Sequence, residues 1–226
     1  MQQSLFGSLA ATDTATLENA PQAFDSVLLE DAVFTVLDLE TTGLSAKKNA
    51  ITEVTAIQFR NGEQVGIYST LVKPTEEIPE EVELLTGITN DMVRHSPAIV
   101  MVLSELSGFL GEAPIIVGHN VSFDMGFLRE KITQNGLGAF LERYNYSRAF
   151  CTKVLAQRAL PSLPSYEGVM VATAIGYHNP NPHRAEADVR MSAGILFELI
   201  KRLKAENPNL KTLQDLLNYQ GVLQER

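Results

Sequence analysis

The chain has 226 residues, of which 45% are hydrophobic and 20% are charged, a composition typical of a globular protein with one sizeable domain. Its single cysteine, Cys151, excludes an internal disulfide and fits a reducing cytoplasm. No apolar run approaches the roughly 18 residues needed to cross a membrane. The absence of Lys and Arg before Lys47 also argues against the basic start of a signal peptide. We therefore expect a cytoplasmic protein without membrane contact.

The net charge of −9 is distributed unevenly along the chain. Acidic residues dominate residues 1–119, whereas residues 120–226 contain more Lys and Arg than Asp and Glu. A negative net charge argues against tight, sequence-independent binding of duplex nucleic acid, because such binding depends on neutralising many phosphates. It does not exclude binding of a few nucleotides at a chain end. Solvated surface charge explains the asymmetry equally well.

The first half of the chain predicts a mobile arm followed by a run of strands. Residues 1–30 are polar with weak periodicity and are expected to form an arm with one short helix over residues 15–29. Apolar and β-branched runs predict strands over residues 33–39, 51–60 and 64–72, the last two joined by an Asn61-Gly62 hairpin turn. Short helices are expected over residues 80–85 and 90–93, and a longer one from Pro97 to about residue 110.

The second half alternates short strands with helices. Strands are expected over residues 115–118 and 147–150, and helices over residues 122–135, 152–159, 166–175, 184–204 and 212–217. This order favours an α/β domain with a mixed sheet. We place its boundaries at residues 31–206, between the arm of residues 1–30 and a helical extension over residues 207–226.

Acidic residues in apolar surroundings are the main candidates for chemistry. Asp38 and Glu40, in VLDLETTGL, are two apart on a predicted strand and share one face. Asp124 lies in VGHNVSFDMGFL, and Asp188 follows His183 in HRAEAD. A buried charge is costly unless it is paired or binds a metal, and carboxylate oxygens suit Mg²⁺ or Mn²⁺. Taken singly, a strand-end acid is more often solvated, and a histidine in a Pro-rich loop more often lies on the surface.

Three segments, in order, resemble one enzyme family. DLETTGL (residues 38–44), GHNVSFDMGFL (residues 118–128) and HRAEAD (residues 183–188) are similar to the three motifs of the DEDDh 3′–5′ exonucleases. This is the family of the proofreading (epsilon) subunit of bacterial DNA polymerase III. ELLTGITNDMV (residues 83–93) is similar to a further segment common there. The resemblance implies a ribonuclease H-like fold, a five-stranded mixed sheet flanked by helices, with residues 31–206 as the exonuclease domain.

The resemblance also implies roles for the candidate residues. Asp38, Glu40, Asp124 and Asp188 match the four metal-site acids, and His183 matches the catalytic histidine of the subfamily. Two divalent ions, Mg²⁺ or Mn²⁺, are expected, one activating a water and one stabilising the leaving 3′ oxygen. Asp38 would bridge the ions, Glu40 and Asp188 would complete the first site, and Asp124 would support the second. His183 is expected to act as general base.

The expected reaction releases nucleoside 5′-monophosphates from the 3′ end of DNA. Single-stranded or frayed ends, in proofreading or repair, are the leading substrate. A 3′–5′ exoribonuclease that trims RNA or short oligoribonucleotides is the alternative, because a 2′-hydroxyl is recognised by pocket geometry that the sequence does not give. A rival of another class is a non-catalytic scaffold tethered to a clamp or polymerase.

The turn after Glu40 is expected to contact the substrate. Small residues let backbone N–H groups approach a nucleotide, and Leu44 is placed to wedge against a base; the candidates are Thr41, Thr42, Gly43 and Leu44. Asn120 is a further candidate for substrate binding, and it is expected either to cap the following helix or to hold the active-site strand ends together.

Aromatic and apolar residues near the second motif have competing interpretations. Phe123 is a candidate for stacking on a terminal base, with core packing as the alternative. We expect Phe127 to pack in the core, His119 to be structural, and Cys151 to be a small buried hydrophobe. Arg184 and Lys153 are expected to be solvated rather than bound to phosphates.

The N-terminal arm carries one candidate docking motif. Gln2-Gln3-Ser4-Leu5-Phe6 resembles the pentapeptide by which bacterial replication proteins bind the sliding clamp. Pentapeptides match by chance often, so a featureless polar arm is the alternative. A DNA polymerase or helicase subunit is a further candidate partner, with the arm and the residues after Pro208 as the expected attachment segments.

Overall fold

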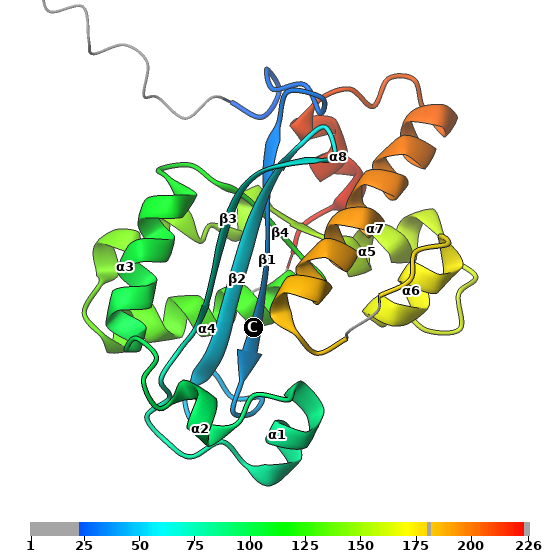
Figure 1. Ribbon diagram of the computed structural model, residues 1–226. Helices are drawn as coiled ribbons and strands as arrows, with labels where there is room; N and C mark the ends of the chain where they lie inside the picture. The colour runs from blue at the N-terminus through cyan, green and yellow to red at the C-terminus, as the bar shows by residue number, and fades with distance from the viewer. Residues whose placement is uncertain (1–22, 180–181, 224–226) are drawn as a thin grey trace, which may run out of the picture.

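The computed structural model describes residues 23–179 and 182–223, and its centre is a five-stranded sheet (Figure 1). The strands are β1 (Val33–Thr41), β2 (Ile51–Arg60), β3 (Glu63–Leu71), β4 (Ile115–Gly118) and β5 (Ala149–Cys151). Their order across the sheet is β3-β2-β1-β4-β5. β1–β2 and β2–β3 are antiparallel, whereas β1–β4 and β4–β5 are parallel. The predicted mixed five-stranded sheet is therefore confirmed.

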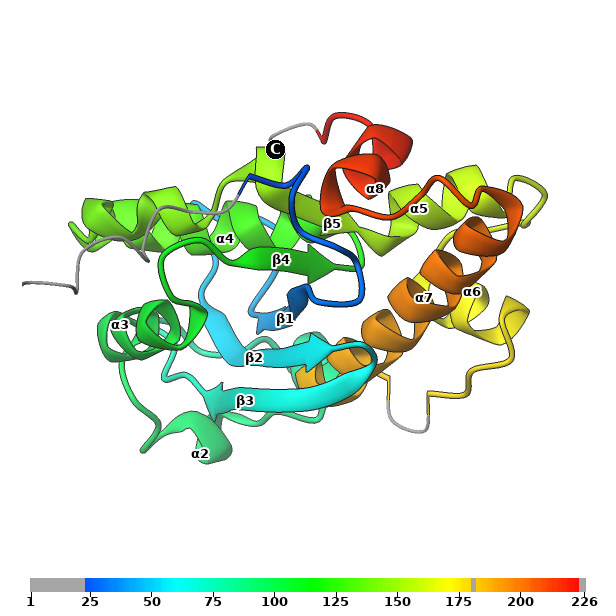
Figure 2. The same cartoon turned by 90° about the horizontal axis from the view of Figure 1, so that it is seen from above.

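Helices cover both faces of this sheet. The α-helices are α1 (Glu80–Thr86), α2 (Asn90–Val93), α3 (Ile99–Leu110), α4 (Val121–Gln134), α5 (Thr152–Ala159), α6 (Gly168–Ala174), α7 (Ala185–Glu206) and α8 (Leu213–Gln220). Two 3₁₀ segments that the sequence did not predict, Gly138–Arg143 and Tyr146–Arg148, connect α4 to β5. Figure 2 shows α3 and α4 on one face and α5, α6 and α7 on the other.

Alternation along β1 divides the core into two layers. Phe34 and Val36 point towards α7, whereas Leu37 and Leu39 join the cluster beneath α3 and α4. Side chains two apart on a strand share a face. Asp38 and Glu40 therefore lie on the α7 face, between the sheet and the start of α7.

The segment before β1 differs from the prediction. Residues 23–29, expected to end a helix, form turns and a bridge between Leu28 and Thr212. Phe24 and Leu29 are buried, and the Leu29 N–H donates to the Lys211 carbonyl at 2.9 Å. These contacts replace helical hydrogen bonds, so the expected arm is packed from Phe24 onward. The predicted docking motif Gln2–Phe6 lies outside the described residues.

The C-terminal segment is built into the domain. Leu213 and Leu216 of α8 belong to the core on the α7 face. The Gln220 side chain is 1% exposed; it accepts the Cys151 N–H at 2.6 Å and donates to the Ala149 carbonyl at 3.0 Å. Gln220 thus pairs with β5 where the sheet ends. Within the described residues, no helix has the length and apolar character to span a membrane.

Candidate functional site

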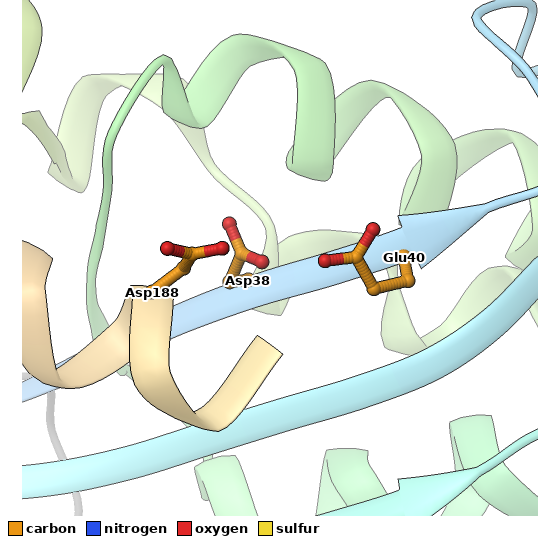
Figure 3. A group of neighbouring side chains, drawn as sticks. All are labelled: Asp38, Glu40 and Asp188. Atoms are coloured by element: carbon orange, nitrogen blue, oxygen red, sulfur yellow. The ribbon is translucent and has the colours of Figure 1, made fainter. Parts of the chain in front are cut away.

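Three carboxylates from two distant elements meet at one point. Asp38 and Glu40 project from β1, and Asp188 projects from the first turn of α7. All three are partly buried, and each offers an oxygen atom within 4.8 Å of the others. Figure 3 shows the three side chains turned towards a shared space. The structure therefore brings together three of the four predicted metal-site acids.

Asp124 lies beside this group. It is 3% exposed on α4, and the Leu39 backbone hydrogen-bonds to its carboxylate. Burial is the largest cause that raises the pKa of the Asp38 carboxyl, and the charge of Asp124 is the next. The two carboxylates are therefore close enough to repel each other. Asp124 is not within the 4.8 Å group, and a more distant or water-mediated role fits this position.

The acids repel one another. Burial is the main cause that raises the pKa of Glu40 to about 8, followed by the charges of Asp188 and Glu53, while Arg184 acts in the opposite direction. Burial also raises the pKa of Asp188 and, together with Asp124, that of Asp38. Clustered buried carboxylates of this kind are stabilised when a cation is bound. Oxygen donors at this spacing fit a divalent metal ion.

Two hydrogen-bond donors in the segment just before α7 orient the Asp188 carboxylate. The Asn179 side-chain amide donates to Oδ1 at 2.7 Å, and the His183 backbone N–H donates to Oδ2 at 2.8 Å. Both carboxylate oxygens are thus held in place before any metal binds. The sequence did not single out Asn179, because nothing in its spacing indicates a contact with Asp188.

His183 lies where the predicted loop enters α7. It is exposed, and its backbone φ of +63° is in the left-handed region, which is uncommon outside Gly but enriched in Asn, Asp and His. In this conformation the backbone N–H of His183 donates to Asp188 Oδ2 at 2.8 Å. Its charge lowers the pKa of Asp188, which places the ring within electrostatic reach of the site.

In the turn after β1, one predicted contact residue is buried. Thr42 is 3% exposed; its hydroxyl bonds the Glu76 carboxylate and accepts the Ala50 N–H at 2.9 Å. These contacts occupy the Thr42 hydroxyl, and the Thr42 N–H donates to the Ala50 carbonyl at 2.9 Å, so neither group is available for the substrate contact predicted at Thr42. Thr42 instead fixes the turn against the Glu76 segment.

The rest of the turn is open. The Thr41 hydroxyl donates to the Gly43 carbonyl at 2.7 Å, and Leu44 is 89% exposed. A Cβ on Gly43 would lie 2.8 Å from the Asn49 side chain, so only glycine fits without displacing that amide. Leu44 remains the best-placed apolar candidate for contact with a base.

The predicted residues around α4 divide into structural and open positions. Asn120 begins α4 in a left-handed conformation, φ +72°, and makes no side-chain cap, so the capping prediction is wrong. Phe123 is partly buried, with its ring centroid 4.8 Å from that of Phe127, which is in the core as predicted. His119 bonds Thr152 and the Tyr166 carbonyl through its two ring nitrogens, which confirms a structural role.

Sequence reasoning missed a fifth acid near the site. Glu53 lies on β2 directly opposite Glu40 and is 5% exposed. It pairs with Arg184, which is therefore neither the free solvated side chain that was expected nor a free phosphate ligand. A charged residue inside the apolar run ITEVTAIQF was the available signal, but the register that places it beside Glu40 is not visible in the sequence.

Comparisons with known proteins agree with this geometry. Residues 35–196 match the exonuclease family model. The chain is 33% identical over 202 residues to a PolC-type DNA polymerase III of Thermotoga maritima, covering 88% of this chain and 14% of that protein. It is 34% identical over 175 residues to the DNA polymerase III epsilon subunit of Aquifex aeolicus, covering 77% of this chain and 84% of that one.

Comparison with solved structures agrees on the fold. E. coli exonuclease I in complex with a dT13 oligonucleotide superimposes with a TM-score of 0.68 at 19% identity, covering 80% of this chain and 43% of that one. The chain spans only about one seventh of the length of the PolC-type relatives. The match to the family model and the epsilon subunit nevertheless covers most of the domain. The chain therefore belongs to the DEDDh 3′–5′ exonuclease family, with its ribonuclease H-like fold.

Proposed function

We propose that this chain is a metal-dependent 3′–5′ exonuclease that releases nucleoside 5′-monophosphates from a DNA end. The observation that supports this most strongly is the meeting of Asp38, Glu40 and Asp188 within 4.8 Å, with Asp124 beside them. Without a cation these acids repel one another. A divalent metal would relieve that repulsion, so the cluster is better suited to metal binding than to stabilising the fold.

Two ions, Mg²⁺ or Mn²⁺, are the proposed cofactors. When bound, such ions lower the pKa of a water and stabilise charge on a leaving oxygen. Asp38, Glu40 and Asp188 would hold them, with Asp124 supporting from α4. His183 is the proposed general base, because it is exposed and adjacent to Asp188 and can take a proton from the attacking water.

Single-stranded or frayed DNA is the proposed substrate, in proofreading or repair. The PolC-type relative of Thermotoga maritima and the epsilon-subunit relative of Aquifex aeolicus are both named as DNA polymerase III proteins, which favours DNA over RNA. The turn after β1 supports binding at a chain end, since Leu44 is exposed and free to contact a base. Thr41, Asn120 and Phe123 remain candidate contacts around this turn.

The test compares single-stranded DNA, mismatched primer-template DNA and single-stranded RNA, each 5′-labelled, in Mg²⁺ and in Mn²⁺. Faster shortening of the two DNA substrates supports the proposal, and preferred loss of RNA would reassign the chain to RNA processing. Asp38→Ala serves as the contamination control. No loss of any substrate would indicate a non-catalytic scaffold or a missing partner.

Partner binding is a separate part of the proposal. A peptide of residues 1–8 should bind the bacterial sliding clamp through Leu5 and Phe6, since an exposed apolar pair can fill a pocket. Equal binding after replacement of both residues by alanine would reject the motif. A polymerase subunit is the second candidate partner, supported by the names of the relatives, and a helicase subunit is the third.

The proposed cytoplasmic location is supported by the single cysteine, Cys151.

A further inference from the structure

Glu53 is an additional buried acid that the metal-site geometry does not use. It lies on β2 opposite Glu40, and its side chain is 7% exposed. Among the described residues, it is not part of the group of carboxylates that meet within 4.8 Å. A further negative charge here adds to the repulsion on Glu40, so its presence needs a separate explanation.

The contacts of Glu53 all lead to the start of α7. Its Oε1 accepts the Arg184 Nη2 at 3.0 Å, and its Oε2 accepts the Arg184 Nε at 3.4 Å. Oε2 also accepts the backbone N–H of Ala185 at 3.1 Å. Ala185 is the first residue of α7, and Arg184, at the N-cap, provides no side-chain cap of its own. Glu53 therefore caps this helix from a different element.

This cap connects the sheet to the helix that carries the site. The first N–H groups of a helix lack partners within it, and a carboxylate there is stabilised by the helix dipole. Asp188 lies in the same first turn, and His183 comes just before Arg184. Fixing the start of α7 against β2 thus fixes both residues relative to Asp38 and Glu40, which lie on the neighbouring strand β1.

We propose that Glu53 is a positioning residue of the metal site. Its carboxylate anchors the start of α7, so that Asp188 and His183 face the acids of β1, while Arg184 neutralises the additional charge. This inference rests on the proposed function only in assuming that the acids bind a divalent cation. It gives Glu53 no contact with metal or substrate.

The test measures the rise in unfolding temperature as a function of Mn²⁺ concentration in wild type and Glu53→Gln. A glutamine has one acceptor oxygen and a donating amide, so Arg184 or Ala185 loses its acceptor. Loss of such supporting contacts typically weakens metal sites by 10–100-fold, so we expect the half-saturating Mn²⁺ concentration to rise about tenfold or more. Turnover should fall by a similar factor, with little change in KM.

Glu186→Gln is the matched control. Glu186 lies in the same first turn of α7 and pairs with Arg190 at 2.8 Å, but its side chain is 49% exposed. The charge change is identical, and the Mn²⁺ dependence should match wild type. If Glu53→Gln does not fold, Glu53→Asp retains the charge on a shorter side chain, and its half-saturating Mn²⁺ concentration should lie above that of Glu186→Gln.

Two results would overturn the proposal. A lower unfolding temperature with an unchanged half-saturating Mn²⁺ concentration would make Glu53 a residue of the fold alone. Complete loss of Mn²⁺ stabilisation, equal to that of Asp38→Ala, would make it a direct ligand. The readout is metal binding, so the role of Glu53 can be tested even if no substrate is cleaved. In that case the proposed exonuclease function would be rejected, while the positioning role of Glu53 would stand.

Discussion

The two walls of the candidate site are built in different ways. The sheet wall consists of Asp38 and Glu40 on β1, a central strand whose pairing with β2 runs along both residues, so backbone hydrogen bonds fix their positions. The helix wall consists of Asp188 and His183, and side chains orient it: Asn179 on the Asp188 carboxylate and Glu53 on the start of α7. The sheet wall is therefore expected to tolerate changes around it, whereas the helix wall depends on single contacts.

The largest effect is expected on the sheet wall. Asp38→Ala should reduce turnover by about a thousandfold or more, since metal ions contribute several kcal/mol to transition-state stabilisation. Without metal the variant should be at least as stable as wild type, because Asp38 is repelled by its neighbours. Circular dichroism and thermal unfolding provide the fold control. Activity near the wild-type level would show that the site is misassigned.

On the helix wall, His183→Asn should lower turnover by roughly 10²–10⁴-fold, as expected for loss of a general base. Asparagine tolerates the left-handed backbone at this position, φ +63°, and keeps the N–H that donates to Asp188. Mn²⁺ should therefore stabilise the variant as it does wild type. An unchanged rate would leave His183 as a surface residue.

The electrostatics of both walls predict a dependence on pH. The folded pKa of Glu40 is about 8, above its ordinary value of 4.5, because of burial and neighbouring acids. Its contribution to the free energy of unfolding is fully present below about pH 4.5 and is lost as the pH rises through about 8. The metal-free unfolding temperature should fall between pH 5 and 8, and the stabilisation by Mn²⁺ should grow. A metal-free unfolding temperature that is independent of pH would contradict the proposed repulsion.

Away from the site, Gln220→Ala separates stability from activity. It leaves the Cys151 N–H and the Ala149 carbonyl without partners, at a cost of about 1–3 kcal/mol for each buried group. Denaturant unfolding should show the loss, and turnover per folded molecule should not change. Gln214→Ala, on the exposed side of the same helix, is the control. A fall in turnover per folded molecule would link α8 to the site.

The smallest effect is expected at the open turn. Leu44→Ala should leave stability within about 0.5 kcal/mol, since the side chain is 89% exposed. If Leu44 contacts a base, KM for single-stranded DNA should rise while kcat changes little. Met101→Ala, at an exposed apolar position on α3, is the comparison variant. Equal KM values for the two variants would remove Leu44 from the substrate contacts.

The sheet wall was largely predictable from the sequence. The run VFTVLDL indicates a buried strand, its alternation puts Asp38 and Glu40 on one face, and Asn61-Gly62 indicates the hairpin that pairs β2 with β3. These features are local, because residues close in sequence decide them. The observed strands differ from the predicted ranges by no more than two residues at either end.

The supports of the helix wall and of the turn could not be predicted. Glu53 reaches Arg184 across 131 residues, and Thr42 reaches Glu76 across 34, so neither contact leaves a local pattern. The segment before β1 fails for the same reason, because Leu29 takes its backbone partner from Lys211. Resemblance to a family indicated which acids meet, and only the structure shows what holds them.

The most direct measurement is anomalous X-ray scattering from crystals of the chain soaked in Mn²⁺. The two walls should form one centre, so a peak is predicted within ligand distance of Asp38, Glu40 and Asp188, and it should disappear in Asp38→Ala. The crystal must leave the site open to solvent, and the Mn²⁺ concentration must be saturating. Under these conditions, the absence of a peak between these carboxylates would contradict the assignment of a metal centre.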